Sequence, residues 1–390
     1  MLDDMVEEIA EENVVQVVTD NASNYVKAGS MLEATRPYLY WTPYAAHCID
    51  LMLEDIGKIP RVRNTLKGAM FCNGYIYNHV GIVNMMRRFT NQRNLHRPAI
   101  TRFATSFITL SQMHKQKNNL RKMITSPEWN NSKWSKDAAG KRLTSTFLQE
   151  RFWRNIVFAL KLTGPLVKVL RMVDGDKKPA MGYIYESMDR AKETIAASFL
   201  HKEEHYKKAF EYIDARWDCQ LHRPLHAAGF FLNPELYYKN PENAMCAEVM
   251  NGLYATIQRL VPDLSTQDKI GEQLDLYQNA QGLFGNPMAI RQRDKRAPAD
   301  WWSAYGASAP ELHKFAIRLL GHLSLIILLG GHLHQVSSTR KASETSNCRR
   351  ASRGFSLIDE EIEEDIGVSE DDGEEEVLGI DVDDDDADEF

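Results

Sequence analysis

The sequence predicts an α/β segment at the amino end of the chain, then a long and mainly helical region, and finally an acidic tail. The run Val14–Val18 has high β-propensity and is too short for a helix, so it predicts a buried strand. Helical patterns begin at Leu51, and no strand pattern occurs between residues 110 and 290. From Phe355 to Phe390 the sequence has 19 acidic residues and no lysine or arginine, a composition that predicts disorder.

The amino end predicts the order strand, helix, strand, helix, preceded in residues 1–12 by the end of another helix. An Asn/Ser-rich segment after the first strand can start a helix near Ala22. Tyr38–Trp41 predicts the second short strand. Thr42 and Pro43 then predict an N-cap followed by proline at the first position of the next helix.

Asp20 follows the first strand directly. The carboxyl ends of strands are the edge of an α/β sheet where ligands and metals usually bind, so Asp20 is a candidate metal-binding acid. The alternative is that Asp20 only caps the helix that begins near Ala22. From these residues alone, capping is the favoured role.

A basic cluster lies at Arg87 and Arg88 and continues to Arg93 and Arg97 beside His96. Two interpretations remain open for it. The cluster is either a solvated helix face or a contact to nucleic-acid phosphates.

Aromatic residues mark further points of the helical region. Phe103 and Phe107 are spaced i, i+4, which favours a core position for both. The polar stretch Asn118–Lys141, with Trp129 and Trp134, predicts a loop. Helices are expected again over residues 147–173 and 183–217, and further helical segments over residues 254–260 and 270–280.

His222 and His226 are spaced i, i+4, as in some metal sites. Pro224 lies between them and argues against a regular helix that would bring them to one face. We therefore do not expect a metal site here.

Charge is unevenly distributed along the chain. The whole sequence has a formal net charge of −7, but the residues before Phe355 hold 47 basic and 35 acidic residues, a net charge of +12. A basic body suits binding to a phosphate backbone, and an excess of this size is also common in proteins that bind no nucleic acid.

The five cysteines show no CxxC pair and no zinc-finger spacing, which indicates a reducing compartment. The amino end lacks the apolar pattern of a signal peptide. The most apolar segment, Leu319–Leu329, has eleven residues and is too short to span a bilayer. The sequence predicts a soluble, intracellular protein with no membrane partner and no small-molecule cofactor.

Pro298–Leu320 is a second informative stretch. Trp301 and Trp302 precede Ser308, a candidate N-cap, and Pro310 near the helix start. An apolar stripe at helical spacing follows, and such a stripe is more often core than partner surface. Its members are Leu312, Phe315, Ala316, Leu319, Leu320 and Leu323.

The motifs VVTDNASN and WTPYAAHCIDLMLEDIG, separated by a spacer of about twenty residues, resemble the hAT family of DNA transposases, whose catalytic core has a ribonuclease-H-like fold. The resemblance continues through ITRFATSFITL, the segment FWRNIVFALKLTGPLVKVLRMVDGDKKPAMGYIYE, HRPLHAAGFFLNP and DWWSAYGASAPELHKFAIRLL. It covers roughly residues 1–320 and stops near Gly321.

The resemblance implies a domain organisation. Residues 1–58 would be a partial ribonuclease-H-like segment, the α/β remnant of that fold, and the sequence starts after the strand that carries the family's first catalytic acid. Residues 59–295 would be the large all-α insertion. Residues 296–335 would begin the C-terminal dimerisation region, divergent after about 320, and residues 336–390 would be a disordered Ser/Arg segment and the acidic tail.

The resemblance also implies site residues. Asp20 matches the second of the family's three metal-binding acids, and the third, a glutamate, has no counterpart. His47 matches the end of the family's Cys-or-Asp, x, x, His motif, whose first position is Tyr44 here. Two-metal chemistry needs clustered carboxylates, so we expect Mg²⁺ at Asp20 only if another subunit complements the site.

For DNA, the resemblance places Arg102 and Phe103 near the transposon end, where the aromatic ring would stack on a flipped base. Arg87 and Arg88 are the other expected DNA contacts. The expected dimerisation residues are Trp301, Trp302, Leu312, Phe315 and Leu319.

The expected function is that of a nuclear, transposase-derived protein that lacks strand-transfer activity, binds DNA, and dimerises with itself or with a related transposase. Two alternatives remain. One is a Mg²⁺-dependent nuclease or transposase that is active only with a complementing subunit. The other is a helical protein–protein interaction module with no nucleic-acid role.

Overall fold

The computed structural model describes six parts of the chain, all within one compact unit that spans residues 1–345. These parts are predominantly helical and contain four short strands, which confirms the predicted helical majority. The expected disordered segment, residues 336–390, lies outside the described residues. The described residues are 2–9, 14–95, 103–174, 180–321, 324–327 and 334–335.

The amino end has the predicted order of a leading helix followed by strand, helix, strand and helix. The two strands are parallel, and Val17 lies opposite Trp41. Both strands begin and end a residue or two later than predicted. The elements are α1 (Leu2–Ile9), β1 (Gln16–Thr19), α2 (Ser23–Thr35), β2 (Tyr40–Pro43) and α3 (Ala45–Gly57).

The prediction that Thr42 caps a helix with Pro43 at its first position is wrong. Pro43 is the last residue of β2 and lies opposite Thr19, and α3 begins at Ala45 after Tyr44. The backbone amide of Tyr44 donates to the carbonyl of Thr19 (2.6 Å), so strand pairing continues past the proline. Because β2 is an edge strand, the missing N–H of proline costs the sheet nothing there.

The sheet has the order β2-β1-β3-β4. β3 (Ser324–Ile327) runs parallel to β1, and β4 (His334–Gln335) pairs antiparallel with β3. Neither β3 nor β4 was predicted from the sequence. With partners on both edges, β1 is an interior strand, and all four of its residues are buried.

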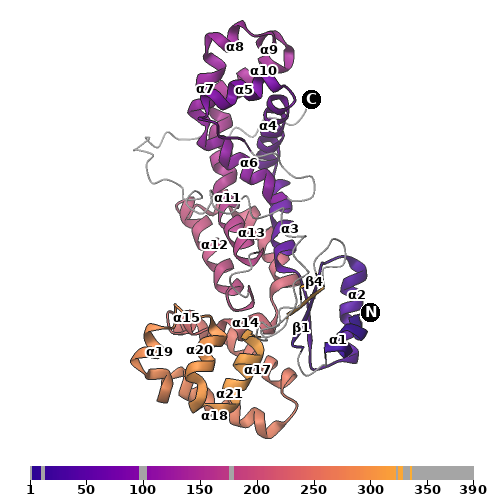
Figure 1. Cartoon of the computed structure of the whole chain (residues 1–390), viewed down its shortest axis with the longest axis vertical. Helices are drawn as coiled ribbons and strands as arrows, with labels where there is room; N and C mark the ends of the chain where they lie inside the picture. The colour runs from indigo at the N-terminus through magenta and orange to yellow at the C-terminus, as the bar shows by residue number, and fades with distance from the viewer. Residues whose placement is uncertain are drawn as a thin grey trace, which may run out of the picture. The chain divides into compact units, whose positions relative to one another are not determined.

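Helices α1 and α2 cover one face of the sheet (Figure 1). Val17 and Trp41 pack there with Val6 of α1 and Leu32 of α2. A Cβ atom at Gly29 of α2 would lie 2.2 Å from the indole of Trp41, so α2 can approach β2 this closely only with glycine at that position. The other face of the sheet contributes Val15 and Tyr40 to a larger core.

The rest of the described chain is helical. Helices α5, α7, α8, α9 and α10 lie together in Figure 1. The first group of helices is α4 (Pro60–Tyr77), α5 (Val80–Phe89), α6 (Phe103–Lys115), α7 (Lys117–Thr125), α8 (Pro127–Asn131), α9 (Lys133–Lys136), α10 (Ala138–Leu148) and α11 (Glu150–Asp174). The later elements are η2 (Ala180–Gly182), α12 (Ile184–Ser198), η3 (Glu203–His205), α13 (Lys207–Arg216), η4 (Trp217–Leu221), α14 (Pro224–Leu232), α15 (Pro234–Tyr237), α16 (Pro241–Ala244), α17 (Ala247–Leu260), α18 (Leu264–Gln278), η5 (Gly282–Gly285), α19 (Pro287–Arg291), α20 (Pro298–Tyr305), η6 (Gly306–Ser308) and α21 (Pro310–Gly321).

The prediction of a loop at Asn118–Lys141 is wrong, because the chain forms four short helices there. The hydroxyl of Ser126 accepts from the amide of Trp129 (3.1 Å), and that of Ser132 accepts from the amide of Ser135 (3.3 Å). Each serine therefore starts a new helix. Trp129 is buried, and its indole anchors these short helices although the surrounding sequence is polar and rich in serine.

One core cluster, here called the aromatic core, joins the second face of the sheet to the later helices. It includes Val15 and Tyr40 from the sheet region together with Tyr277, Trp301 and Trp302. The rings of Tyr277 and Trp302 lie 4.8 Å apart. The aromatic core thus contains residues from both sides of the expected boundary at residues 295 and 296.

Candidate functional site

The carboxylate of Asp20 takes part in the turn between β1 and α2. Its Oδ1 accepts a hydrogen bond from the backbone amide of Ala22 (3.0 Å), the residue that precedes the first turn of α2. This is the hydrogen bonding of an Asx turn. Asp20 is half-buried at the carboxyl end of β1, as the sequence predicts, and it supports the start of α2.

The residue that precedes α3, Tyr44, binds a second acid. The hydroxyl of Tyr44 donates to Oδ1 of Asp174 (2.7 Å), at the end of α11. Tyr44 is bonded through its amide to Thr19, the neighbour of Asp20. The half-buried His47 lies one turn further along α3. Asp174 is 130 positions from Tyr44, so no sequence pattern could have indicated it.

The acids and histidines described here do not fit a two-metal site. In the part of the chain that the structure describes, no group of three or more His, Cys, Asp or Glu residues is arranged to hold a metal ion. Two-metal phosphodiester chemistry requires several carboxylates around paired Mg²⁺ ions. The described residues therefore do not supply the ligand set of a two-metal site.

The histidine pair is also engaged within the chain. His226 is buried, and its Nδ1 donates to the carbonyl of Leu221 (2.6 Å). Burial lowers the pKa of His226 to about 4. His222 precedes α14, which begins at Pro224, and its Nε2 lies 2.9 Å from a carboxylate oxygen of Glu248.

The candidate DNA-stacking residue Phe103 lies at the start of α6. Its ring is 39% exposed, whereas Phe107 one turn later is buried, so only Phe107 is a core residue. The Asp50 carboxylate on α3 accepts hydrogen bonds from the amides of Ala104 (3.0 Å) and Phe103 (3.4 Å). This side-chain cap fixes the first turn of α6 against α3, and therefore also the exposed ring. Arg102 lies outside the described residues.

The positive charge of the chain is concentrated in residues 59–174, which contain helices α4–α11 and are here called the basic helical unit. This range has 21 lysine and arginine residues against 4 aspartate and glutamate residues. The remaining residues before Phe355 have 26 basic and 31 acidic residues. A count of charge over segments would have revealed this from the sequence, whereas a count over the whole body hides it.

Three arginines of the basic helical unit, Arg61, Arg151 and Arg154, lie close enough for their charges to interact. The guanidinium of Arg61, at the start of α4, lies over the ring of Phe158 at 4.0 Å and donates to Oδ1 of Asn155 (2.8 Å). Burial lowers the pKa of Arg61, and the positive charges of Arg151 and Arg154 lower it further. The cluster therefore places like charges side by side, a situation that a bound anion relieves.

The four acids of the basic helical unit all have partners in the chain. Arg88 lies at the end of α5 and its partner is in α8, while Arg87 donates to Oδ1 of Asn94 (3.0 Å). The described hydrogen bonds and ion pairs link neither arginine to the Phe103 end of α6. The acid partners are Arg88 for Glu128, Tyr75 for Asp137, Lys117 and Arg121 for Glu150, and Tyr44 for Asp174.

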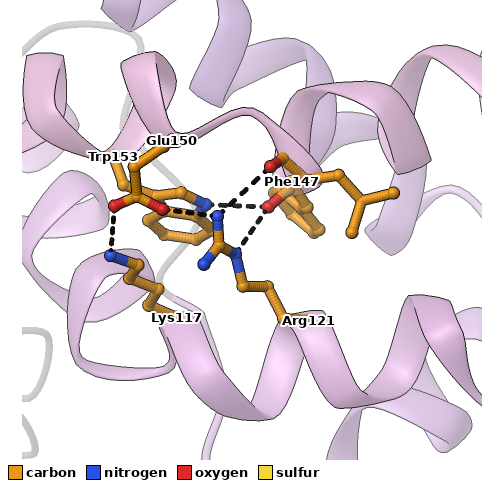
Figure 2. Close-up of polar contacts among 6 residues, drawn as sticks. Lys117, Arg121, Phe147, Glu150 and Trp153 are labelled. Carbon is orange, nitrogen blue, oxygen red and sulfur yellow. Dashed lines mark hydrogen bonds and ion pairs between the residues drawn. The ribbon is translucent and has the colours of Figure 1, made fainter.

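Figure 2 shows how Arg121 joins three helices. Its guanidinium donates to the carbonyls of Phe147 (3.0 Å) and Leu148 (3.2 Å) at the end of α10. It also pairs with Glu150 at the start of α11 (2.7 Å), which binds Lys117 as well (2.7 Å). The hydrogen bonds of Lys117 and Arg121 hold the pKa of Glu150 below its usual range. Arg121 therefore has a structural role.

The five candidate dimerisation residues lie in the interior of the chain. Trp301, Trp302 and Leu312 are fully buried, and Phe315 and Leu319 are at most 4% exposed. The indole N–H of Trp301 donates to the carbonyl of Ala289 (2.9 Å), and that of Trp302 donates to the carbonyl of Leu232 (2.8 Å). They stabilise the fold, and dimerisation itself stays a prediction.

A family model described as Domain of unknown function (DUF659) matches residues 1–70, from α1 into α4. This domain is found in hAT-like transposase-related proteins. No curated protein matches the chain. None of the described helices is long and apolar enough to cross a membrane.

Proposed function

We propose that this chain is a transposase-derived protein that binds DNA through the basic helical unit and has no strand-transfer activity of its own. The observation that carries the proposal is the concentration of charge in residues 59–174, 21 basic against 4 acidic residues, with the acids already bound inside the chain. The match of residues 1–70 to a domain of transposase-related proteins supports the origin of the chain.

Electrostatics explains why DNA is the expected ligand. Each lysine or arginine that neutralises a phosphate releases a condensed counterion, and this release drives binding without regard to base sequence. The positive charges of Arg61, Arg151 and Arg154 repel one another, and a phosphate bound beside them relieves this repulsion. The exposed ring of Phe103 adds an apolar face on which an unpaired base can stack, which is worth roughly 1–3 kcal/mol per base.

The proposal includes a ribonuclease-H-like origin for the sheet. Two observations support it. β1 and β2 are parallel neighbours joined by a helix, and Asp20 follows the carboxyl end of β1. We do not propose strand-transfer activity, because Asp20 supports a turn and the described acids do not cluster around it. A nuclear location and a dimer with itself or a related transposase complete the proposal.

The test is a gel-shift salt titration of the full chain with a random-sequence duplex of about 30 base pairs. We expect affinity to fall steeply between about 50 and 200 mM salt. The double variant Arg151→Gln/Arg154→Gln should weaken binding about tenfold or more and reduce the salt slope by about 2. Both residues are exposed, so the fold should tolerate the change.

The matched control is Lys207→Gln/Lys269→Gln, which removes two exposed positive charges from α13 and α18, outside the basic helical unit. It should leave both affinity and salt slope unchanged. An affinity that does not depend on salt, or an equal loss in the two double variants, would contradict the proposal and favour the interaction module without a nucleic-acid role.

A further inference from the structure

A pocket of about 450 Å³ opens outside the basic helical unit, between α12, α13 and η4, with further contributions from α14, the C-terminal side of α16, and α17. This volume lies within the range of small-ligand pockets, roughly 300–1,000 Å³. Nothing in the proposed DNA-binding function uses this pocket, and the inference below does not depend on that function.

The inner wall of the pocket is aromatic. The rings of Tyr185 and Phe230 are buried and stacked at 5.5 Å, and the half-buried ring of Trp217 meets Tyr185 edge-on at 5.6 Å. Aromatic faces attract organic cations through the negative potential above the ring. They offer no ligand atom for a metal ion.

A π-helical turn places two of the lining residues. In η4 the amide of His222 donates to the carbonyl of Trp217 (2.8 Å), five residues earlier. Such turns are rare and occur frequently at functional sites, because the extra residue redirects the side chains of the turn. Here the π turn carries both Trp217 and Asp218, which line the pocket.

Negative charge surrounds the aromatic wall. Two of the four lining carboxylates have partners within the chain: Asp214 pairs with Lys192 (2.5 Å), and Glu248 accepts from the hydroxyl of Tyr185 and lies 2.9 Å from Nε2 of His222. The other two, Asp189 and Asp218, form no hydrogen bond or ion pair with any residue that the structure describes. The pocket therefore has an excess of acceptor oxygens beside its aromatic rings.

The surroundings of Asp189 disfavour its charged form. Desolvation and the neighbouring carboxylates of Glu186 and Glu248 together raise the pKa of Asp189 to about 6, against the opposing charge of Lys192. A cation bound beside Asp189 would remove this repulsion. A phosphate or a carboxylate ligand would increase it.

We propose that this pocket binds an organic cation with a guanidinium head, whose plane stacks on the half-buried ring of Trp217 and whose N–H groups donate to Asp189 and Asp218. The planar, weakly hydrated guanidinium suits this combination better than a compact ammonium, because it both stacks on rings and binds carboxylates through several donors. The head group can belong to a free small molecule or to an arginine side chain of a partner protein.

Two exposed cysteines give a direct test in the unmodified full chain. Cys246 lines the pocket and Cys219 does not, and both are free and exposed. The chain is treated with N-ethylmaleimide at increasing concentrations of agmatine, and the alkylation rate of each cysteine is followed by mass spectrometry of peptides. We expect agmatine to slow alkylation of Cys246 saturably and to leave Cys219 unaffected.

The variants Asp189→Asn and Asp218→Asn should each raise the half-protecting agmatine concentration about five- to tenfold, since each removes one charge-assisted contact. The control Asp268→Asn makes the same change on an exposed position of α18 that does not line the pocket, and it should behave as the unsubstituted chain. Putrescine, with ammonium heads, should protect more weakly than agmatine.

A short Gly-Arg-Gly peptide identifies the source of the head group. Protection by the peptide at lower concentrations than by agmatine assigns the site to a partner's arginine, and the reverse order assigns it to a free guanidinium compound. Equal alkylation rates of Cys246 with and without both probes would overturn the proposal. Equal protection by the uncharged 1-butanol would also overturn it, because the charge would then have no part in binding.

Discussion

The basic helical unit and the aromatic core differ in charge and in burial. The unit has 21 basic against 4 acidic residues, and most of its lysines and arginines are exposed. The aromatic core has buried rings whose polar atoms are satisfied within the chain, as in the indole of Trp302. The excess positive charge of the basic helical unit favours binding of an anion. The polar atoms of the aromatic core already have their hydrogen-bond partners within the chain.

Because of this difference, DNA affinity and the free energy of unfolding should depend on different residues. A substitution in the aromatic core should change the free energy of unfolding and affect DNA binding only through the fold. A charge-removing substitution in the basic helical unit should change DNA affinity and leave stability nearly intact, since exposed charges contribute little to it. Each prediction below tests one side of this separation.

The largest effect is expected for Trp302→Ala. The change removes a fully buried indole and leaves the carbonyl of Leu232 without its donor, so the free energy of unfolding should fall by about 3–5 kcal/mol. Urea unfolding followed by circular dichroism measures the loss. The control Leu264→Ala, at a side chain 71% exposed, should stay within about 0.5 kcal/mol. A loss below about 1 kcal/mol in Trp302→Ala would contradict a stabilising role for this core.

The buried imidazole of His226 should make stability depend on pH. Its pKa is about 4 in the folded chain and near 6.5 when unfolded, so protons bind the unfolded state more readily. The contribution is fully present above pH 6.5 and is lost as the pH falls towards 4, for a total of about 3 kcal/mol. Comparing urea unfolding at pH 7.5 and pH 5 checks this. In His226→Gln the loss between the two pH values should be smaller, whatever its stability at pH 7.5, and an unchanged loss would contradict the assignment.

Arg121 and Arg151 give a matched pair within the basic helical unit. Arg121→Gln removes donors to two helix-end carbonyls and to Glu150, and should lower the free energy of unfolding by about 1–2 kcal/mol. It should alter DNA affinity little, because Glu150 already neutralises the charge. Arg151→Gln should do the reverse, with stability within about 0.5 kcal/mol. Equal effects of the two variants on either measurement would remove the distinction between structural and binding arginines.

The sequence predicts the regular parts of this fold well, because apolar runs and helical spacing are local signals. The order of elements around β1 and the burial of the stripe from Leu312 to Leu320 follow from them. The helices within Asn118–Lys141 were missed because serines that start helices resemble loop residues. The contact between Tyr44 and Asp174, and the Arg61 cluster, depend on tertiary packing, and local patterns do not encode it.

The smallest effect is expected for Asp20→Asn. Asparagine can accept the same hydrogen bond from the amide of Ala22, so the free energy of unfolding should change by less than about 0.5 kcal/mol, and DNA affinity should not change. Asp20→Ala, which removes the acceptor, should cost about 0.5–1 kcal/mol. A plasmid-nicking assay of the full chain with Mg²⁺ or Mn²⁺ completes the comparison, and neither the unsubstituted chain nor the variants should nick DNA. Metal-dependent nicking that Asp20→Asn abolishes would show that the carboxylate acts in catalysis, and the sheet edge would then belong with the nucleic-acid-binding region.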